Sequence, residues 1–464
     1  MSGPSDVARW NRRDDLPVVR SSPGAGPIVV VLVLIGLPIA LALTLSGSHA
    51  TYDTWGAFVW APVLLALVFP LCRWVAKRTD EPQLAGFLFA AAVLKIVVGA
   101  IARYYMVDAI YGRGDSLGYD NAAARLVGPF RHGDFRGLGQ ITGTRFIDVL
   151  TGAVQAVIGE TMVGSFLVFA AMGFVGLCLF YLAFCEALPS GDRRLYRLLI
   201  FLTPTMWFWP SAVGKEAFLT MCLGAAAYGF ARLTRGHLFG LVTAALGLWG
   251  TAVVRPHIAL MLLVGAALAA PAFNTGLPGE RRMLARFALP VLVLLALPAV
   301  LGAAERFFHI QHLDLATATQ VREEVVRRTS GGGSEFRAPN TSNPVGMVEG
   351  LVTVTFRPFP WEAGGFQRVA ALESVVLLGV LLTAAARRGV RLIGALRDRW
   401  PRFALGYVLA FAWAFSAVSN FGILARQRSL MLPFLFVLVS AVPWRAQADA
   451  AVEDVQPAAS ELRR

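Results

Sequence analysis

A long series of apolar segments constrains the fold of this chain more than any other feature. About a dozen stretches have the ~20 predominantly apolar residues that a helix needs to cross a bilayer. Charged residues make up only 15% of the 464 residues, whereas a soluble domain carries about a quarter. The sequence therefore predicts an all-α, polytopic transmembrane helical bundle with about 12 spans.

The predicted spans are apolar stretches bounded by charged or turn-forming residues. They cover roughly residues 27–47, 56–74, 84–104, 162–186, 196–210, 215–233, 238–254, 257–273, 287–304, 367–386, 403–420 and 429–444. The first stretch precedes Ser48-His49-Ala50, which also fits a signal-peptide cleavage site, but its length favours an uncleaved anchor. We expect a cytoplasmic tail at 1–26, a membrane domain at 27–444 and a second cytoplasmic tail at 445–464.

The distribution of Lys and Arg between the turns predicts the orientation. With the amino terminus inside, the inside turns carry 17 Lys and Arg, and the short outside turns carry four. Such a bias follows the positive-inside rule and puts both termini in the cytoplasm. We expect a multi-pass protein of a bacterial plasma membrane.

Two long loops fall on the predicted extracytoplasmic side, at about 105–161 and 305–366. The stretch Arg145 to Gly159 alternates apolar and polar residues with helical spacing, which predicts an interfacial helix. The second loop contains Thr329-Ser330-Gly331-Gly332-Gly333-Ser334, which reads either as a plain linker or as the hinge of a lid.

Polar clusters between the spans all fall on this same side. They are the segments 114–120, 209–216, 254–257, 356–362 and 426–428. Carboxylates and fixed cations gathered at one membrane surface indicate a site for a polar, phosphate-bearing substrate there, with the active site extracytoplasmic.

Asp115 is the leading candidate for a general base. Flanking glycines let the backbone turn sharply, and Tyr119 falls on the same face of a helix that begins there. A carboxylate just outside the membrane can accept a proton from an attacking hydroxyl. The alternative is that Asp115 only caps this helix. Asp120 and Asp108 are less favoured candidates for the base.

The segments around residues 215 and 255 supply further candidates. Lys215 and Glu216 are adjacent, so their side chains diverge by about 100° on a helix and need separate partners. Arg255, followed closely by His257, lies between two spans with almost no loop. A guanidinium there suits bidentate contact with phosphate oxygens, of a lipid headgroup or of a lipid-linked substrate.

Candidates from the last third of the chain are also cations and acids. Arg357 and Glu362 lie among prolines and aromatic residues that suit a sugar over a phosphate, or a membrane interface. Arg426 and Arg428 break the charge rule at an outside turn, which favours a phosphate role. Lys95 and Glu373 are the deep charges and should face protein or water.

Other classes of site have little support in the sequence. The net charge of +13 comes from loop arginines that flank apolar spans, a topological pattern that argues against a nucleic-acid partner. The histidines are scattered, so no metal site is predicted, although Asp115 and a substrate phosphate could share a divalent ion. The four cysteines lie in apolar segments and read as core residues.

The segment Gly114-Asp115-Ser116-Leu117-Gly118-Tyr119, the following helix and the dozen spans resemble the C-type (GT-C) membrane glycosyltransferases. The Trp209-to-Glu216 and Arg357-to-Glu362 segments also look like those of bacterial surface-polysaccharide membrane proteins. By this resemblance Asp115 is the catalytic base and transfer inverts the sugar carbon. Two departures are plain: the acidic loop follows the third span instead of the first, and Ser116 stands where a second acid is frequent.

The expected function is therefore transfer of a sugar from a polyprenyl-phosphate donor to a glycan, lipid or protein acceptor of the cell envelope. Asp115 would activate the acceptor, and Lys215, Arg255, Arg357, Arg426 and Arg428 would hold the donor phosphate. The alternatives are a surface-polysaccharide polymerase or ligase acting on diphosphate-linked chains, a polysaccharide or lipid exporter, and a scaffold for envelope assembly.

Overall fold

A computed structural model describes residues 52–112, 114–270, 279–312, 314–330, 335–341, 343–365 and 367–443. Within these ranges the chain is all-α, as the sequence predicts, apart from one isolated β-bridge between Glu335 and Asn420. The predicted span 27–47 and both predicted tails lie outside the described residues.

Six helices of the described part are long and apolar enough to cross a membrane. They are α2 (Tyr52–Arg78), the continuous run α3 (Leu84–Ala92), η1 (Val93–Gly99) and α4 (Ala100–Tyr105), then α7 (Met162–Ala187), α10 (Lys215–Thr234), α13 (Gly279–Phe308) and α16 (Gln367–Arg388). A seventh candidate is the pair α19 (Phe421–Arg428) and α20 (Leu432–Ser440), which is bent by 54°. The protein is thus multi-pass, with six or seven candidate spans in the described part.

The prediction of about 12 spans was wrong, because several apolar stretches form helices too short to cross. Helices α11 (Phe239–Val254) and α12 (Pro256–Ala269) have 16 and 14 residues, which corresponds to about 21–24 Å against a core of about 30 Å. The stretch 196–210 is divided into α8 (Arg193–Leu202) and α9 (Pro204–Phe208) at Pro204. Helix α18 (Arg399–Phe415) has 17 residues.

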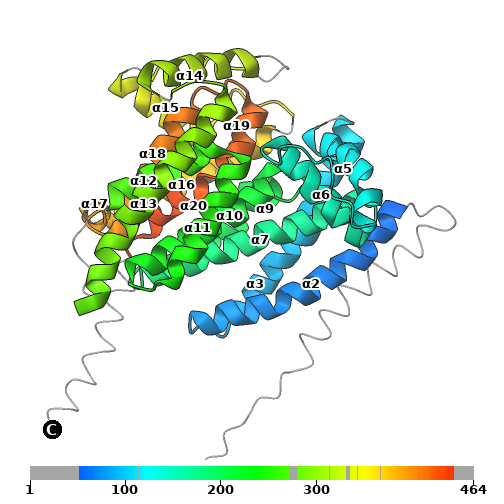
Figure 1. Cartoon of the computed structure of the whole chain (residues 1–464). Coiled ribbons are helices and arrows are strands. Elements are labelled where there is room, and N and C mark those ends of the chain that lie inside the picture. Colours follow the sequence, from blue (N-terminus) through cyan, green and yellow to red (C-terminus); the bar gives the residue numbers. More distant parts are fainter. Residues whose placement is uncertain are drawn as a thin grey trace, which may run out of the picture. The chain divides into compact units, whose positions relative to one another are not determined.

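Helix α10 packs along both α7 and α11 (Figure 1). Small residues let α7 and α10 approach closely, as is usual between membrane helices. A Cβ atom on Gly176 would lie 2.4 Å from the carbonyl oxygen of Thr220, and one on Gly224 would lie 2.4 Å from that of Gly176. The contact leaves no room for a side chain at either glycine.

We expect Gly176→Ala to lower the free energy of unfolding by about 1–3 kcal/mol, because the new methyl group must push two backbones apart. The control is Gly86→Ala, where a Cβ meets nothing within 4 Å and helix propensity favours alanine. Unfolding by SDS in mixed micelles measures both variants. Equal midpoints for the two would show that this crossing is looser than described.

Arginine–acid pairs tie together the turns at the end of the bundle where the sequence places the cytoplasm. Arg193 and Arg197 bind Glu81 at 3.5 and 3.1 Å, and Arg388 binds the buried Asp192 at 2.7 Å. Several cations of the positive turns therefore also hold the fold.

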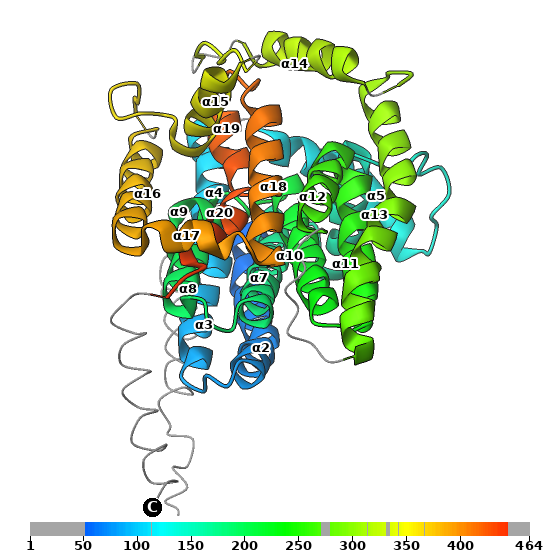
Figure 2. The ribbon, with the colours of Figure 1, turned by 90° about the vertical axis from the view of Figure 1, so that its left-hand side faces the viewer.

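Both long loops contain helices. The first holds α5 (Asp115–Arg131) and α6 (Thr144–Ile158), which pack on each other, and α6 matches the helix expected at 145–159. The second holds α14 (Leu315–Thr329) and α15 (Pro344–Phe356). Figure 2 shows α14 lying across the ends of α13 and α18, and Arg322 joins it to α18 through Ser416 at 3.1 Å. Residues 331–334 of the expected hinge lie outside the described residues. The remaining short elements are η2 (Met106–Tyr111) and α17 (Val390–Ala395).

Candidate functional site

Asp115 is the first residue of α5 and faces α19 instead of capping its own helix. Gly114 precedes it with φ of 153°, a conformation that residues with a side chain rarely adopt. One carboxylate oxygen of Asp115 accepts a hydrogen bond from Arg426 Nη1 at 2.8 Å. The side chain remains 59% exposed. The capping interpretation is therefore wrong, and the carboxylate is both oriented by an arginine and open to a ligand.

Glu216 lies in the first turn of α10 and joins three partners from other segments. Its Oε1 lies 3.2 Å from Arg255 Nη2 and 3.3 Å from Arg426 Nε, and it accepts a hydrogen bond from Gln427 Nε2 at 2.9 Å. Only 8% of the Glu216 side chain is exposed. The negative charge of such a buried carboxylate is stabilised by the two guanidinium groups beside it.

Lys215 and Glu216 diverge as the sequence predicts. Lys215 Nζ donates to Thr144 Oγ1, at the start of α6, at 2.9 Å. Its ammonium group also interacts with the charges of Arg255, Glu216 and Asp115. The lysine therefore lies beside the acidic residues while its hydrogen bond holds the first loop.

Arg255 occupies the tight connection between α11 and α12, where the sequence places it. Its guanidinium turns into the protein, with 13% of the side chain exposed, and donates hydrogen bonds to Glu216 and to Gln427 Oε1. The lipid-headgroup interpretation of Arg255 has no support in this geometry, because the guanidinium is held by protein groups.

These residues form one group, which we call the acid–arginine cluster: Asp115, Glu216, Arg255, Arg426 and Gln427. Its members come from α5, α10, the α11–α12 connection and α19. Ser116 Oγ helps to fix the arrangement by donating to the carbonyl of Val213, just before α10, at 2.7 Å. Segments more than 300 residues apart thus meet at the start of α10.

Tyr119 lies beside the cluster, one helical turn after Asp115. It is buried, and its phenol interacts with the charges of Glu216 and Asp115. Burial, followed by these two carboxylates, raises the pKa of Tyr119 above its ordinary value. The phenol therefore stays neutral and can donate its hydrogen to a substrate oxygen.

Arg428 belongs to a different environment from Arg426. Two residues on a helix are separated by about 200°, so the two guanidinium groups point to opposite sides of α19. Arg428 is fully buried and donates to the Thr355 carbonyl at 2.8 Å and to Ser374 Oγ at 3.0 Å. Glu373 lies 4.0 Å away from it. This arginine joins α15, α16 and α19 and lies outside the acid–arginine cluster.

Arg357 and Glu362 pair with each other at 3.1 Å. The guanidinium also covers the ring of Phe336, with its Cζ 4.4 Å from the ring centroid. Neither residue has a described contact with the acid–arginine cluster. Each residue of this pair is therefore the structural partner of the other.

Asp120 lies apart from the cluster, whereas His257 borders it and interacts with the charges of Arg255 and Lys215. Asp120 accepts a hydrogen bond from Gln155 Nε2 of α6 at 2.6 Å, and burial raises the pKa of its carboxyl group. His257 packs among aromatic rings, with centroids of Phe307 and Phe308 at 5.5 and 5.6 Å. The side chain of Asp108 lies outside the described residues.

The sequence interpretation missed Arg103, Gln427 and Thr144. Arg103, near the end of α4, interacts with the charges of Arg426, Glu216 and Asp115. Its position at the end of a span resembles that of an ordinary anchoring arginine, which hides its role. Gln427 and Thr144 are neutral, and only the tertiary contacts reveal them.

The described residues contain no group of three or more His, Cys, Asp or Glu placed to hold a metal ion. Asp115 and Glu216, the two carboxylates of the cluster, both bind Arg426. The part of the chain that is described thus offers guanidinium groups as the charged ligands for a phosphate.

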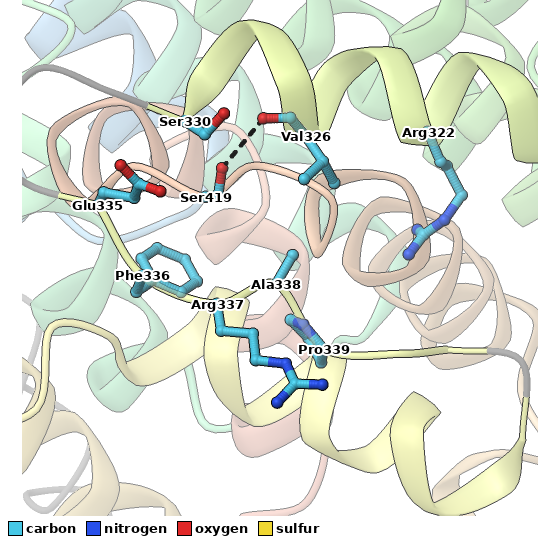
Figure 3. A pocket seen from close by; sticks show the side chains of 9 residues that line it. All are labelled: Arg322, Val326, Ser330, Glu335, Phe336, Arg337, Ala338, Pro339 and Ser419. Atoms are coloured by element: carbon cyan, nitrogen blue, oxygen red, sulfur yellow. Dashed lines mark hydrogen bonds between the residues drawn. The ribbon is translucent and has the colours of Figure 1, made fainter.

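An open pocket of about 640 Å³ lies between α14 and the start of α19 (Figure 3). Its lining includes Arg322, Glu335, Arg337 and Ser419, and Ser419 Oγ donates to the Val326 carbonyl at 3.3 Å. Its volume lies in the range of small-molecule sites. The pocket shares no residue with the acid–arginine cluster.

No protein-family model, curated protein or solved structure matches this chain. The acid–arginine cluster is the feature of the described structure that bears on function. Its geometry offers an exposed carboxylate beside two guanidinium groups, a combination that can accept a proton and stabilise an anionic leaving group in one place.

Proposed function

We propose that the protein is a membrane glycosyltransferase that moves a sugar from a polyprenyl-phosphate donor to a cell-envelope glycan, lipid or protein acceptor. The observation that carries the proposal is the contact between Asp115 and Arg426 within the acid–arginine cluster. It supports the proposal because sugar transfer from a phosphate requires a base beside a cation that can bind the phosphate.

In the proposed reaction Asp115 takes the proton of the acceptor hydroxyl as its oxygen attacks the sugar C1. The bond between C1 and the donor phosphate oxygen breaks, and its electron pair stays on that oxygen. Arg255 and Arg426 stabilise the new charge. A single displacement of this kind inverts the configuration at C1. In this proposal Tyr119 donates its hydrogen to a substrate oxygen.

Glu216 has a positioning role in this proposal. Because its carboxylate binds both Arg255 and Arg426, the two guanidinium groups are held before substrate arrives. Preorganised charges stabilise a transition state without reorganisation at the moment of reaction. The buried Glu216 thus supports the residues that would touch the phosphate.

The charge bias of the turns supports an extracytoplasmic site. The cations at 73–78, 193–197, 232–235 and 387–402 fall at one end of the helices, and the cluster forms at the opposite ends of α10 and α4. We propose that both termini are cytoplasmic in a bacterial plasma membrane.

The runner-up is a surface-polysaccharide polymerase or ligase that uses the arginines without a required acid. The exposure of Asp115 beside Arg426 favours the transferase, because a general base has to be open to the acceptor hydroxyl. An exporter has less support. The deep Lys95 donates to the carbonyls of Met206 and Pro210, and Glu373 accepts from the backbone of Thr205, so both have structural partners.

The proposal is tested by deleting the gene for this protein and analysing the lipid-linked sugars of the cell. We expect a polyprenyl-phosphate monosaccharide to accumulate together with an envelope glycan that lacks one type of residue. Complementation with the wild-type chain should reverse both effects. Accumulation of a complete, diphosphate-linked repeat unit would instead support the polymerase, and an unchanged lipid pool would contradict both.

A further inference from the structure

Arg103 is a buried cation whose charge has no acidic partner within ion-pair distance among the described residues. Its residue surface is 6% exposed. The guanidinium stacks near the rings of Trp209 and Phe208, with Cζ 4.8 and 5.2 Å from their centroids. Among the residues that the structure describes, its Nε has no hydrogen-bond partner, and its Nη1 donates to the sulfur of Met106 at 3.7 Å.

Anchoring at a membrane interface does not explain this side chain. An arginine at the end of a span normally extends its charge to water or headgroups, but Arg103 is enclosed by protein. Burying a cation without a hydrogen-bonded anion is costly. Inside a membrane protein such residues face other helices or a cavity and mark binding sites.

The charges around Arg103 identify the missing partner. Its guanidinium interacts with Arg426, Glu216 and Asp115, and Lys215 and Arg255 belong to the same set. Among the described residues this set has four cations against two carboxylates, an excess of two positive charges. A phosphate with its negative oxygens would balance that excess.

We infer that Arg103 is a phosphate-binding residue and that the acid–arginine cluster takes a polyprenyl phosphate through it. The aromatic rings of Phe208 and Trp209 fix the plane of the guanidinium, so its free edge is preorganised for a phosphate. The choice of a lipid-linked phosphate as the ligand rests on the proposed function. The inference adds a residue that the sequence did not indicate.

The test measures binding, not transfer. Purified protein in detergent is titrated with farnesyl phosphate, and with farnesol as the neutral match, while the thermal unfolding midpoint is recorded. We expect farnesyl phosphate alone to raise the wild-type midpoint. In Arg103→Met this affinity should fall about 10-fold or more, as expected for loss of a charge-assisted contact, while the ligand-free midpoint stays at or above that of wild type.

Arg232→Met is the matched control. Arg232 also has an Nε without a partner in the described part of the chain and lies over the ring of Tyr228, at 5.8 Å. It is 16 residues from Glu216 on α10, about 24 Å along the helix. Arg232→Met should leave the affinity for farnesyl phosphate unchanged. Arg103→Lys should retain part of the affinity, because it keeps the charge and loses the planar fork.

The outcomes separate the two proposals. Wild-type affinity in Arg103→Met, or a sharp fall of its ligand-free midpoint, would overturn the role of Arg103 and leave the proposed function standing. If wild-type protein binds neither farnesyl phosphate nor a longer polyprenyl phosphate, the phosphate donor itself is wrong and both proposals fail.

Discussion

Replacing Asp115 with Asn is expected to lower sugar transfer by about 10²- to 10⁴-fold, the usual contribution of a general base. The amide keeps the size of the side chain and can still accept the hydrogen bond from Arg426, but it cannot take a proton from the acceptor. Asp115 is 59% exposed, so loss of its ion pair should change stability little. The measurement is transfer from radiolabelled polyprenyl-phosphate sugars by purified protein.

Asp120→Asn is the matched control on the same helix. Asp120 binds Gln155 of α6 and has no described contact with the acid–arginine cluster. Its replacement should leave the rate within a few-fold of wild type. Survival of full activity in Asp115→Asn would exclude Asp115 as the base and favour the arginine-driven polymerase.

Replacing Glu216 with Gln should have the largest effect on stability. The neutral amide leaves Arg255 and Arg426 inside the protein without the carboxylate that compensates them both. Removing one partner of a buried ion pair usually costs about 3–5 kcal/mol. Unfolding in SDS mixed micelles should show this loss, and transfer should fall because the two guanidinium groups lose their common anchor.

Glu324→Gln provides the surface comparison. Glu324 also binds two arginines, Arg327 and Arg328, but on the exposed face of α14. Solvent screens that network, so its midpoint should match wild type. If the two glutamate variants unfold alike, Glu216 does not hold the cluster together.

Hydropathy was sufficient to locate most helices but not to count the spans. The apolar stretches at 238–254 and 257–273 do form α11 and α12, yet the polar connection at Arg255 shortens both helices. The break at Pro204 divides another stretch into two pieces. Whether a short apolar helix crosses a membrane depends on its neighbours, which periodicity does not contain.

The candidate site was predictable where local geometry decides it. Neighbours on a helix diverge, so separate partners for Lys215 and Glu216 follow from their adjacency. By contrast, Arg426 and Arg428 look equivalent in the sequence, and only the packing of α19 directs one to Asp115 and the other to Thr355 and Ser374.

Arg103 could not be identified as a site residue from the sequence. Its sequence environment, near the end of an apolar run, is that of an anchoring residue. The enclosure by Phe208 and Trp209 arises because α9 folds back against α4. A buried cation of this kind becomes visible only when segments a hundred residues apart are brought together.

The position of the phosphate in a structure of the protein with a bound polyprenyl-phosphate sugar tests the account most directly. We expect the phosphate oxygens within hydrogen-bond distance of Arg255 or Arg426, and the sugar C1 facing the carboxylate of Asp115. A donor bound instead in the pocket beneath α14, or only along the lipid-facing helices, would contradict the proposed sugar-transfer site.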